Sequence, residues 1–90
     1  MSAIDDVAAE RKRQIEKEGW SHKHDDEHAS GDMAWAAAAY CVSDEDLALE
    51  MLWPWERDWW KPKDYRANLV RAAALIVAEI ERLDRAAARK

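Results

Sequence analysis

The C-terminal third of this 90-residue chain carries one long apolar stripe at helical spacing. Apolar side chains recur there every three or four residues with no internal Gly or Pro, which predicts a helix from Asp64 to about Ala88. Such a stripe is typical of a helix that packs against a core. At ~1.5 Å per residue, this helix is long enough to span the whole domain. The stripe consists of Leu69, Ala72, Ala73, Ile76, Ile80, Leu83 and Ala87, and it is widened by Val70, Ala74 and Val77.

The composition favours an all-α fold. The chain is rich in Ala, Glu, Asp, Arg and Lys but has only two Gly and two Pro, which argues against a sheet protein. Its length fits one domain, residues 1–90, with a modest core. We expect a small helical bundle of three main helices and one short helix, with a tryptophan-rich ordered loop before the long C-terminal helix. A chain this short often completes its core by oligomerising, so a homo-oligomer is expected.

The first helix is expected over residues 3–18. Ser2 and Asp5 have the spacing of a capping box, and Gly19 is a good terminator. The apolar stripe of this helix is thin, so the helix should lie on the surface of the bundle. Trp20 is then expected to fold back onto the core, and Arg13 to face either solvent or a site.

The second helix is expected over residues 30–42, with Ser30 as its N-cap. Its residues are apolar almost all round, which predicts a central position in the packing. The single cysteine, Cys41, lies in this run and is therefore expected to be a buried small hydrophobe. A third, short helix should begin at the capping pattern of residues 43–46 and end before Pro54.

Residues 53–63 contain four of the six tryptophans, two prolines and three cations. A tryptophan face stacks on a flat aromatic group, and a neighbouring arginine or lysine can hold an anion. This pairing suits a nucleotide. The alternative is that these rings only fill the core, because the chain has no Phe. For the whole cluster, we expect at least one ring to line a pocket.

In the nucleotide hypothesis, the base stacks on one of the loop tryptophans and the phosphate is held where the cations meet the start of the last helix. Tyr65 lies in the first turn of that helix. The candidate ligand-binding residues are Arg13, Trp20, His24, Asp25, Asp26, His28, Trp53, Trp55, Arg57, Trp59, Trp60, Lys61, Lys63, Tyr65 and Arg66.

Residues 20–29 read as a polar connection with three histidines and three acids. One interpretation is a solvated loop in which Asp25 or Asp26 caps the next helix. A second is ligand contact, with Asp25, Asp26 or His28 reading a sugar or base edge. A third is a metal site, but the spacing matches no known signature. We therefore expect no metal and no cofactor.

The charge balance and the missing motifs exclude several classes. A net charge of −5 argues against binding to duplex nucleic acid. No apolar run is long enough to span a membrane and the N-terminus lacks a signal-peptide pattern, so a cytoplasmic protein is expected. The chain has no nucleophile motif and no glycine-rich phosphate loop, which favours a non-enzymatic protein with no catalytic residue.

Most of the chain resembles a group of small tailed-phage proteins. The resemblance implies a phage or prophage origin and therefore the cytoplasm of the host cell. It rests on Glu10-x-x-Arg13-Gln14-Ile15-x-x-Glu18-Gly19-Trp20, His24-Asp25-Asp26-x-His28, the Trp-Pro-Trp and Trp-Trp-Lys-Pro segments, and Leu69-Val70 with Ala78-Glu79-Ile80-Glu81-Arg82-Leu83-Asp84.

Two short segments are similar to the ryanodine-receptor (RyR) repeat domain. That helical module has a Gly-Trp turn after its first helix, an acidic pair soon after, and a Lys…Asp-Arg motif that opens a later helix. Here the matching segments are Gly19-Trp20, Asp25-Asp26 and residues 61–66, although Tyr65 splits the last motif and an alanine helix replaces the family's middle segment. Prokaryotic and viral members are thought to bind nucleotide-type ligands, so the resemblance implies such a partner.

Three functional hypotheses follow. The first is a phage-encoded binder of a nucleotide-type molecule, with the role of a sponge that sequesters a host immune signal. The second is a magnesium-dependent nucleoside triphosphate pyrophosphohydrolase, because Glu81 and Asp84 resemble half of the carboxylate set of the all-α MazG type, with Glu79 as a further candidate. The third is a helical module that binds another protein through its Trp and Ala surfaces.

Overall fold

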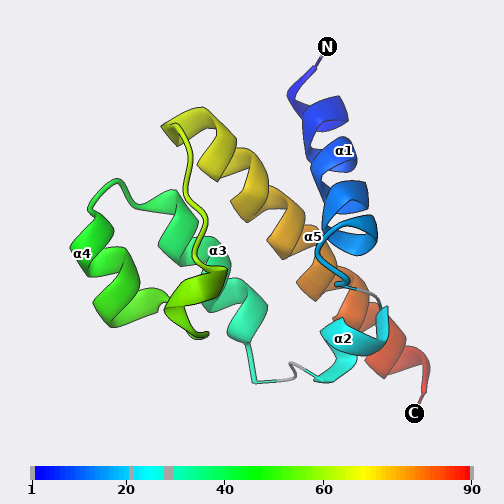
Figure 1. Ribbon diagram of the computed structural model, residues 1–90. Coiled ribbons are helices and arrows are strands. Elements are labelled where there is room, and N and C mark those ends of the chain that lie inside the picture. Colours follow the sequence, from blue (N-terminus) through cyan, green and yellow to red (C-terminus); the bar gives the residue numbers. More distant parts are fainter. Residues whose placement is uncertain (1, 21, 28–29, 90) are drawn as a thin grey trace.

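The computed structural model of the protein describes residues 2–20, 22–27 and 30–89, and all regular secondary structure in these residues is helical. The long helix α5 lies between α1 and α3, and the two chain ends lie far apart (Figure 1). The all-α prediction is therefore confirmed. The elements are α1 (Ala3–Glu16), α2 (His22–Glu27), α3 (Asp32–Cys41), α4 (Glu45–Leu47), the π-helical turn η1 (Ala48–Leu52), the 3-10 turn η2 (Arg57–Trp59) and α5 (Tyr65–Ala88).

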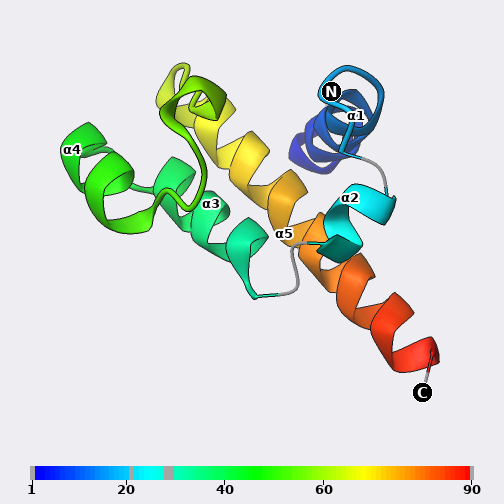
Figure 2. The same cartoon turned by 60° about the horizontal axis from the view of Figure 1, so that its bottom comes forward.

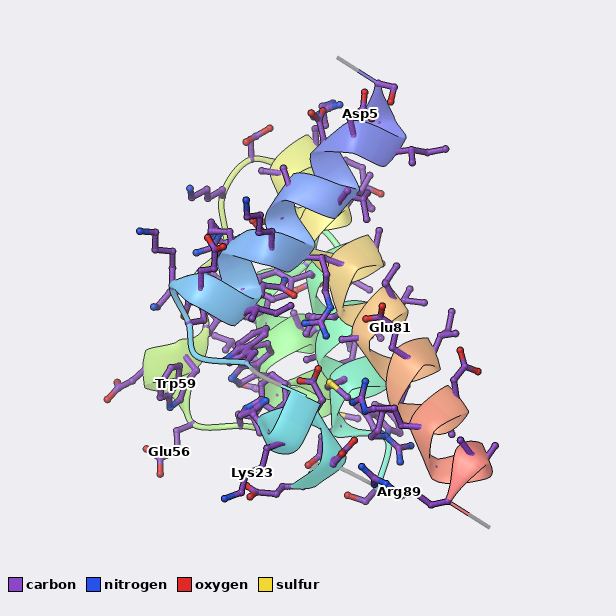
Figure 3. The ribbon with its side chains drawn as sticks, turned by 90° about the vertical axis from the view of Figure 1, so that its right-hand side faces the viewer. Asp5, Lys23, Glu56, Trp59, Glu81 and Arg89 are labelled. Carbon is purple, nitrogen blue, oxygen red and sulfur yellow. The ribbon has the colours of Figure 1, made fainter. Side chains whose placement is uncertain are left out.

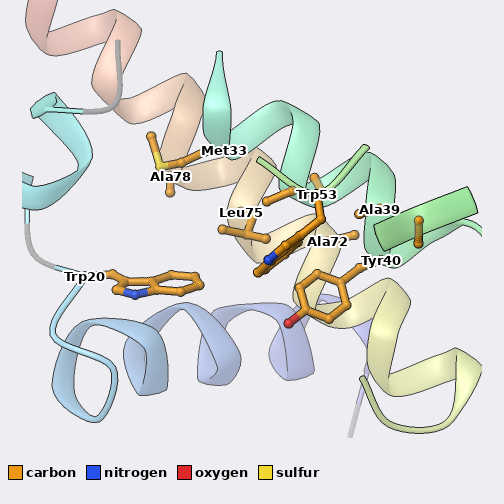
Figure 4. Packing of buried hydrophobic residues seen from close by; sticks show 11 residues of the cluster. Trp20, Met33, Ala39, Tyr40, Trp53, Ala72, Leu75 and Ala78 are labelled. Carbon is orange, nitrogen blue, oxygen red and sulfur yellow. The ribbon is translucent and has the colours of Figure 1, made fainter. Parts of the chain in front are cut away.

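The core lies between α3 and α5. Alanines on both helices are buried, and such small side chains let two helix backbones approach closely. Met33 of α3 and Leu75 of α5 are fully buried among them. Figure 4 shows Leu75, Ala72 and Trp53 meeting in this region, with Trp20 at the end of α1. The helix α1 packs on another side of α5 (Figure 2).

The extent of α5 is as predicted, but its buried face is not. The residues that α5 buries are Arg71, Ala72, Ala74, Leu75 and Ala78, whereas four large members of the expected stripe are exposed: Leu69, Ile76, Ile80 and Leu83. The physical reason is that α3 packs on the alanine side of α5, where close approach is possible. The prediction that the stripe packs on the core is wrong for these four residues.

The N-terminal capping box of α1 is confirmed. The backbone N–H of Asp5 donates to Ser2 Oγ at 3.1 Å, and the backbone N–H of Ser2 donates to Asp5 Oδ2 at 3.4 Å. The side chains that α1 buries are the polar Arg11 and Gln14, while Ile4 is exposed. The helix therefore attaches to the bundle mainly through polar contacts, which explains its thin apolar stripe.

Three local expectations need correction. The polar connection contains the helix α2. The N-cap of α3 is Gly31 instead of Ser30. Its φ is 85°, a backbone conformation that residues other than glycine rarely adopt. Cys41, the last residue of α3, is exposed instead of buried. The expected short helix forms, but its cap is Asp44, whose Oδ1 accepts from the backbone N–H of Leu47 at 3.1 Å.

No helix in the described part of the chain is both long and apolar enough to cross a membrane.

The buried position of Leu75 gives the first prediction. We expect Leu75→Ala to lower the free energy of unfolding by about 2–5 kcal/mol, because it leaves a cavity between α3 and α5. The matched control is Met51→Ala on the exposed surface of η1, which should change it by less than about 0.5 kcal/mol. Urea denaturation of both variants measures the difference, and equal effects would contradict the assigned core.

The N-cap of α3 gives the second prediction. We expect Gly31→Ala to destabilise the protein by roughly 1–2 kcal/mol, because the left-handed conformation is unfavourable for a residue with a Cβ. Ser30→Ala should destabilise the protein less, because the N-cap of α3 is Gly31 and the Ser30 hydroxyl donates to the side-chain carboxylate of Asp32. Thermal unfolding of the two variants measures which one lowers the melting temperature more. A larger effect for Ser30→Ala would indicate that Ser30 is the cap.

Candidate functional site

The aromatic residues form an inner cluster and an outer group. The inner cluster consists of Tyr40, Trp53 and Trp60. The ring of Trp60 stacks on Tyr40 with 4.7 Å between centroids, and the ring of Trp53 meets both rings at their edges. The indole N–H of Trp53 donates to the Glu56 carbonyl at 2.9 Å. These contacts hold the loop before α5 against α3, which confirms that it is ordered.

The outer group consists of Trp20, His24, Trp55 and Trp59, and it lines a pocket of about 640 Å³. Its walls come from the end of α1, from α2 and from the tryptophan-rich loop. Figure 3 shows Glu56 and Trp59 projecting outward from this loop. A cavity of this size is in the range of small-molecule sites. The lining residues are Glu18, Trp20, His24, Pro54, Trp55, Glu56 and Trp59.

Trp20 reaches the pocket because of the turn that ends α1. Gly19 has a φ of 74°, and the backbone N–H of Trp20 donates to the Gln14 carbonyl at 3.0 Å. The indole is thereby folded back onto the core, as predicted. It stacks parallel to the His24 ring, with 5.8 Å between centroids, and meets Trp55 edge-on at 5.6 Å. One wall of the pocket is therefore a continuous aromatic surface.

The buried carboxylate of Asp25 positions His24 in this wall. His24 Nδ1 lies 3.1 Å from Asp25 Oδ1, while Asp25 Oδ2 accepts from Arg11 Nη2 at 2.8 Å. Asp25 is fully buried and Arg11 nearly so. Arg11 Nε also donates to Glu81 of α5 at 3.2 Å. The ion pair therefore attaches α2, and with it His24, to α1 and α5.

Glu18 is one of the two acids that line the pocket, and two cations hold it. Its carboxylate accepts from Arg13 Nη1 at 3.0 Å and from Lys61 Nζ at 3.2 Å. Burial would raise the pKa of Glu18, but the hydrogen bonds from Arg13 and Lys61 outweigh burial and lower it. Arg13 also donates twice to Glu10, and this hydrogen bonding raises the pKa of its guanidinium. Glu18 therefore stays ionised at neutral pH.

Lys61 joins this charged group to the aromatic wall. Its ammonium lies 5.8 Å from the ring centroid of Trp59, within the range of a cation–π contact. Its backbone carbonyl accepts from Arg71 Nη1, and its backbone N–H donates to the Tyr40 hydroxyl at 3.2 Å. The backbone of Lys61 is thus anchored to the core, while its side chain lies beside the pocket.

The structure brings together six of the candidate ligand-binding residues. Trp20, His24, Trp55 and Trp59 line the pocket, and Arg13 and Lys61 hold its acid, Glu18. Trp53 and Trp60 belong to the inner cluster instead, which fits the core-only interpretation for those two rings.

The expected phosphate site at the start of α5 does not assemble, because its cations are apart. Lys61 pairs with Glu18, and Arg66 Nη2 pairs with Asp6 of α1 at 2.7 Å. Lys63 and Tyr65 are exposed and line a smaller hollow on another part of the loop. Arg57 is exposed on η2, the short turn that also carries Trp59. These five residues do not converge on one site.

The candidate residues of the acidic segment are also dispersed. Asp25 is buried in its ion pair, and Asp26 accepts from Arg85 Nη2 at 2.9 Å and Arg89 Nη2 at 2.7 Å. Hydrogen bonds from Arg89 and Arg85 lower the pKa of Asp26. Neither acid lines the pocket, and His28 lies outside the described residues. The part of the chain that the structure describes contains no group of three or more His, Cys, Asp or Glu side chains that could hold a metal ion.

The carboxylates of the pyrophosphohydrolase hypothesis do not converge. Glu81 accepts from Arg11 of α1, and Glu79 accepts from Arg82 at 2.5 Å. Asp84 is exposed. Two of these three acids are thus engaged by arginines, so the geometry provides no argument for a carboxylate cluster at this place.

Sequence reasoning missed three pocket residues: Glu18, Pro54 and Glu56. Glu18 is next to Gly19-Trp20 and five residues after Arg13, with which it forms an ion pair. Its position beside the expected turn was the signal that could have identified it as a site residue. Pro54 and Glu56 flank Trp55, and their position depends on the path of the loop, for which the sequence has no signal.

No family model, no curated protein and no solved structure matches this chain.

The lowered pKa of Glu18 gives a pH prediction. A carboxylate whose pKa is lower when folded stabilises the protein above its unfolded pKa, ~4.3, and loses this contribution as the pH falls through the folded value. We therefore expect Glu18→Gln to destabilise the protein at pH 7 by about 1 kcal/mol, allowing for solvent screening, and by less at acid pH. Urea denaturation at several pH values measures this, with the exposed Glu50→Gln as the control. A difference that stays constant with pH would contradict the assignment.

Proposed function

We propose that this protein binds a nucleotide-type small molecule without transforming it, with the base in the pocket between Trp20, Trp55 and Trp59. The observation that carries the proposal is the convergence of these three indoles, from two distant segments, around one cavity of about 640 Å³. Every nucleobase has a flat π face that stacks on such a ring. A surface meant for a large protein partner would not need a hollow between the rings.

The two acids of the pocket fit the edge of a base. Glu18 and Glu56 both line the cavity. A carboxylate accepts hydrogen bonds from an exocyclic amino group, such as those of cytosine and adenine. Glu18 also accepts from Arg13 and Lys61, so its orientation is set before a ligand arrives. We therefore expect a base with an exocyclic amino group to bind better than one without.

The phosphate is expected to contribute less than the base. Two cations, Lys61 beside Trp59 and Arg13, reach the pocket through their ion pairs with Glu18. Arg57, on the exposed turn η2, is a further candidate at the rim. The net charge of −5 opposes the approach of an anion. Stacking and base recognition thus supply most of the affinity in this proposal.

The biological role within this proposal rests on the resemblance to tailed-phage proteins and to the RyR repeat domain. In a phage, a small binder of nucleotides would serve as a sponge that sequesters a nucleotide signal of the host immune system. Such a role requires only tight binding and no catalytic group. The pocket fits this requirement, because its acid Glu18 is held by Arg13 and Lys61 before a ligand binds.

Tryptophan substitutions test the site. We expect Trp55→Ala and Trp59→Ala each to weaken binding roughly 5- to 150-fold, because stacking on an aromatic ring contributes ~1–3 kcal/mol per base. The matched control is Trp35→Ala on α3, an exposed tryptophan outside the pocket, which should leave binding unchanged. Fluorescence titration with AMP, CMP, GMP, UMP and ADP-ribose measures the affinities, and the corresponding nucleosides isolate the phosphate contribution.

Native mass spectrometry of protein purified gently from a nucleotide-rich lysate provides the natural ligand. A bound mass near that of a nucleotide, at fixed stoichiometry, supports the proposal. If no ligand is retained and no added nucleotide changes the fluorescence or the melting temperature, the proposal is wrong and the protein-interaction hypothesis takes its place. Magnesium-dependent release of pyrophosphate from added triphosphates would instead favour the enzyme.

A further inference from the structure

The helix α5 has two apolar faces, and the larger side chains are on the outer one. On the inner face, Ala72, Ala74, Leu75 and Ala78 are buried against the rest of the protein. On the outer face, four branched side chains remain in solvent: Leu69, Ile76, Ile80 and Leu83 are 39%, 45%, 51% and 53% exposed. A surface helix normally has the opposite arrangement, with polar residues outward. The outer face is therefore a candidate surface for a partner.

The outer apolar side chains follow a heptad repeat. We call Leu69, Ala73, Ile76, Ile80, Leu83 and Ala87 the outer stripe. The steps between its members are four, three, four, three and four residues, which is the spacing of a seam between two helices that pack along their length. At ~1.5 Å per residue the outer stripe is about 27 Å long. Val77 widens it, and the stripe itself contains no charged residue.

The outer stripe is open in the single chain. The helices α1, α2 and α3 all contact α5, yet they leave these branched side chains exposed. In Figure 3, α5 forms one edge of the molecule. The stripe shares no residue with the aromatic pocket, so a partner could bind here without blocking the pocket.

We propose that the outer stripe of α5 packs antiparallel against the outer stripe of a second copy of this chain, which makes the protein a homodimer. The order of its side chains favours this arrangement. Reversing one helix places Leu69 opposite Ala87, Ala73 opposite Leu83, and Ile76 opposite Ile80 of the second copy. Each alanine then faces a leucine, so every layer has a similar volume, as close packing requires.

A parallel arrangement of the same two helices fits less well. It would place Leu on Leu and Ala on Ala, with layers alternately too wide and too narrow for even packing. In the antiparallel pair the two helix dipoles oppose each other, which is favourable.

One acid beside the seam, Glu79, is already paired within its own chain. Glu79 accepts from Arg82 at 2.5 Å, and both side chains are mostly buried. Bringing two copies together therefore leaves no unpaired charge from these residues at the interface. One helix pair is at the small end of the size range for protein interfaces, roughly 1,000–1,200 Å² in total, so we expect association to be reversible.

Sedimentation velocity of the full chain tests the dimer. From about 1 μM to about 1 mM, the range in which interfaces this small dissociate, we expect the mass to rise from 10.4 kDa to twice that value. Ile80→Glu should raise the dissociation constant at least ~100-fold, because it places a charge in the middle layer. The matched control, Met51→Glu on the exposed surface of η1, should leave it unchanged. A wild-type chain that stays monomeric throughout overturns the proposal.

Cysteine pairing tests the orientation. Cys41 is the single cysteine and is exposed, so it is first replaced in a Cys41→Ser background. Leu69→Cys and Ala87→Cys are then prepared separately and incubated in oxidised glutathione, alone and mixed. The antiparallel pair predicts a covalent dimer mainly in the mixture, because these two positions face each other only across chains. Efficient self-pairing of Leu69→Cys, with no disulfide between Leu69→Cys and Ala87→Cys in the mixture, overturns the antiparallel arrangement.

Discussion

The ion pair between Arg11 and Asp25 is the contact on which the arrangement of the helices around the pocket depends. Asp25 uses one oxygen for Arg11 of α1 and the other for His24, and Arg11 continues to Glu81 of α5. One buried carboxylate thus connects three helices and orients an aromatic wall. Removing one partner of such a pair typically costs ~3–5 kcal/mol, because the other charge stays buried. That is a large part of the ~5–15 kcal/mol that stabilises a small domain.

The tryptophans perform two functions because the helices supply few other large apolar side chains to the core. The chain has no Phe, and the contact between α3 and α5 consists largely of alanine. Trp53 and Trp60 therefore fill space against Tyr40, while Trp20, Trp55 and Trp59 surround the cavity. Some rings of the tryptophan-rich segment thus fill the core, and others line a cavity. The inner Trp53 meets the outer Trp55 edge-on at 5.3 Å, so the two sets of rings are in contact.

Local sequence signals predicted the elements well and their faces poorly. The capping box at Ser2, the return of Trp20 and the full length of α5 all follow from short-range chemistry. The helix α2 was missed because its six polar residues have no apolar period, and it is held by long-range pairs instead. The N-cap at Gly31 was missed for a related reason: Ser30 is the better cap in isolation, but the chain enters α3 through a left-handed residue.

The amino-acid sequence by itself determined that this chain is helical, where its long helices run, and that tryptophans and cations gather before α5. These properties depend on neighbours within a few residues, so they can be read along the chain. Only the tertiary structure decided which tryptophans surround a cavity and which face of α5 meets α3. It also decided that the cations of residues 57–66 pair with different acids instead of forming one site. Two faces of α5 are apolar, and hydrophobicity alone favours the one with larger side chains. Close packing against the alanine-rich helix α3 favours the face of α5 with the smaller side chains. The larger side chains of α5 are therefore left at the surface.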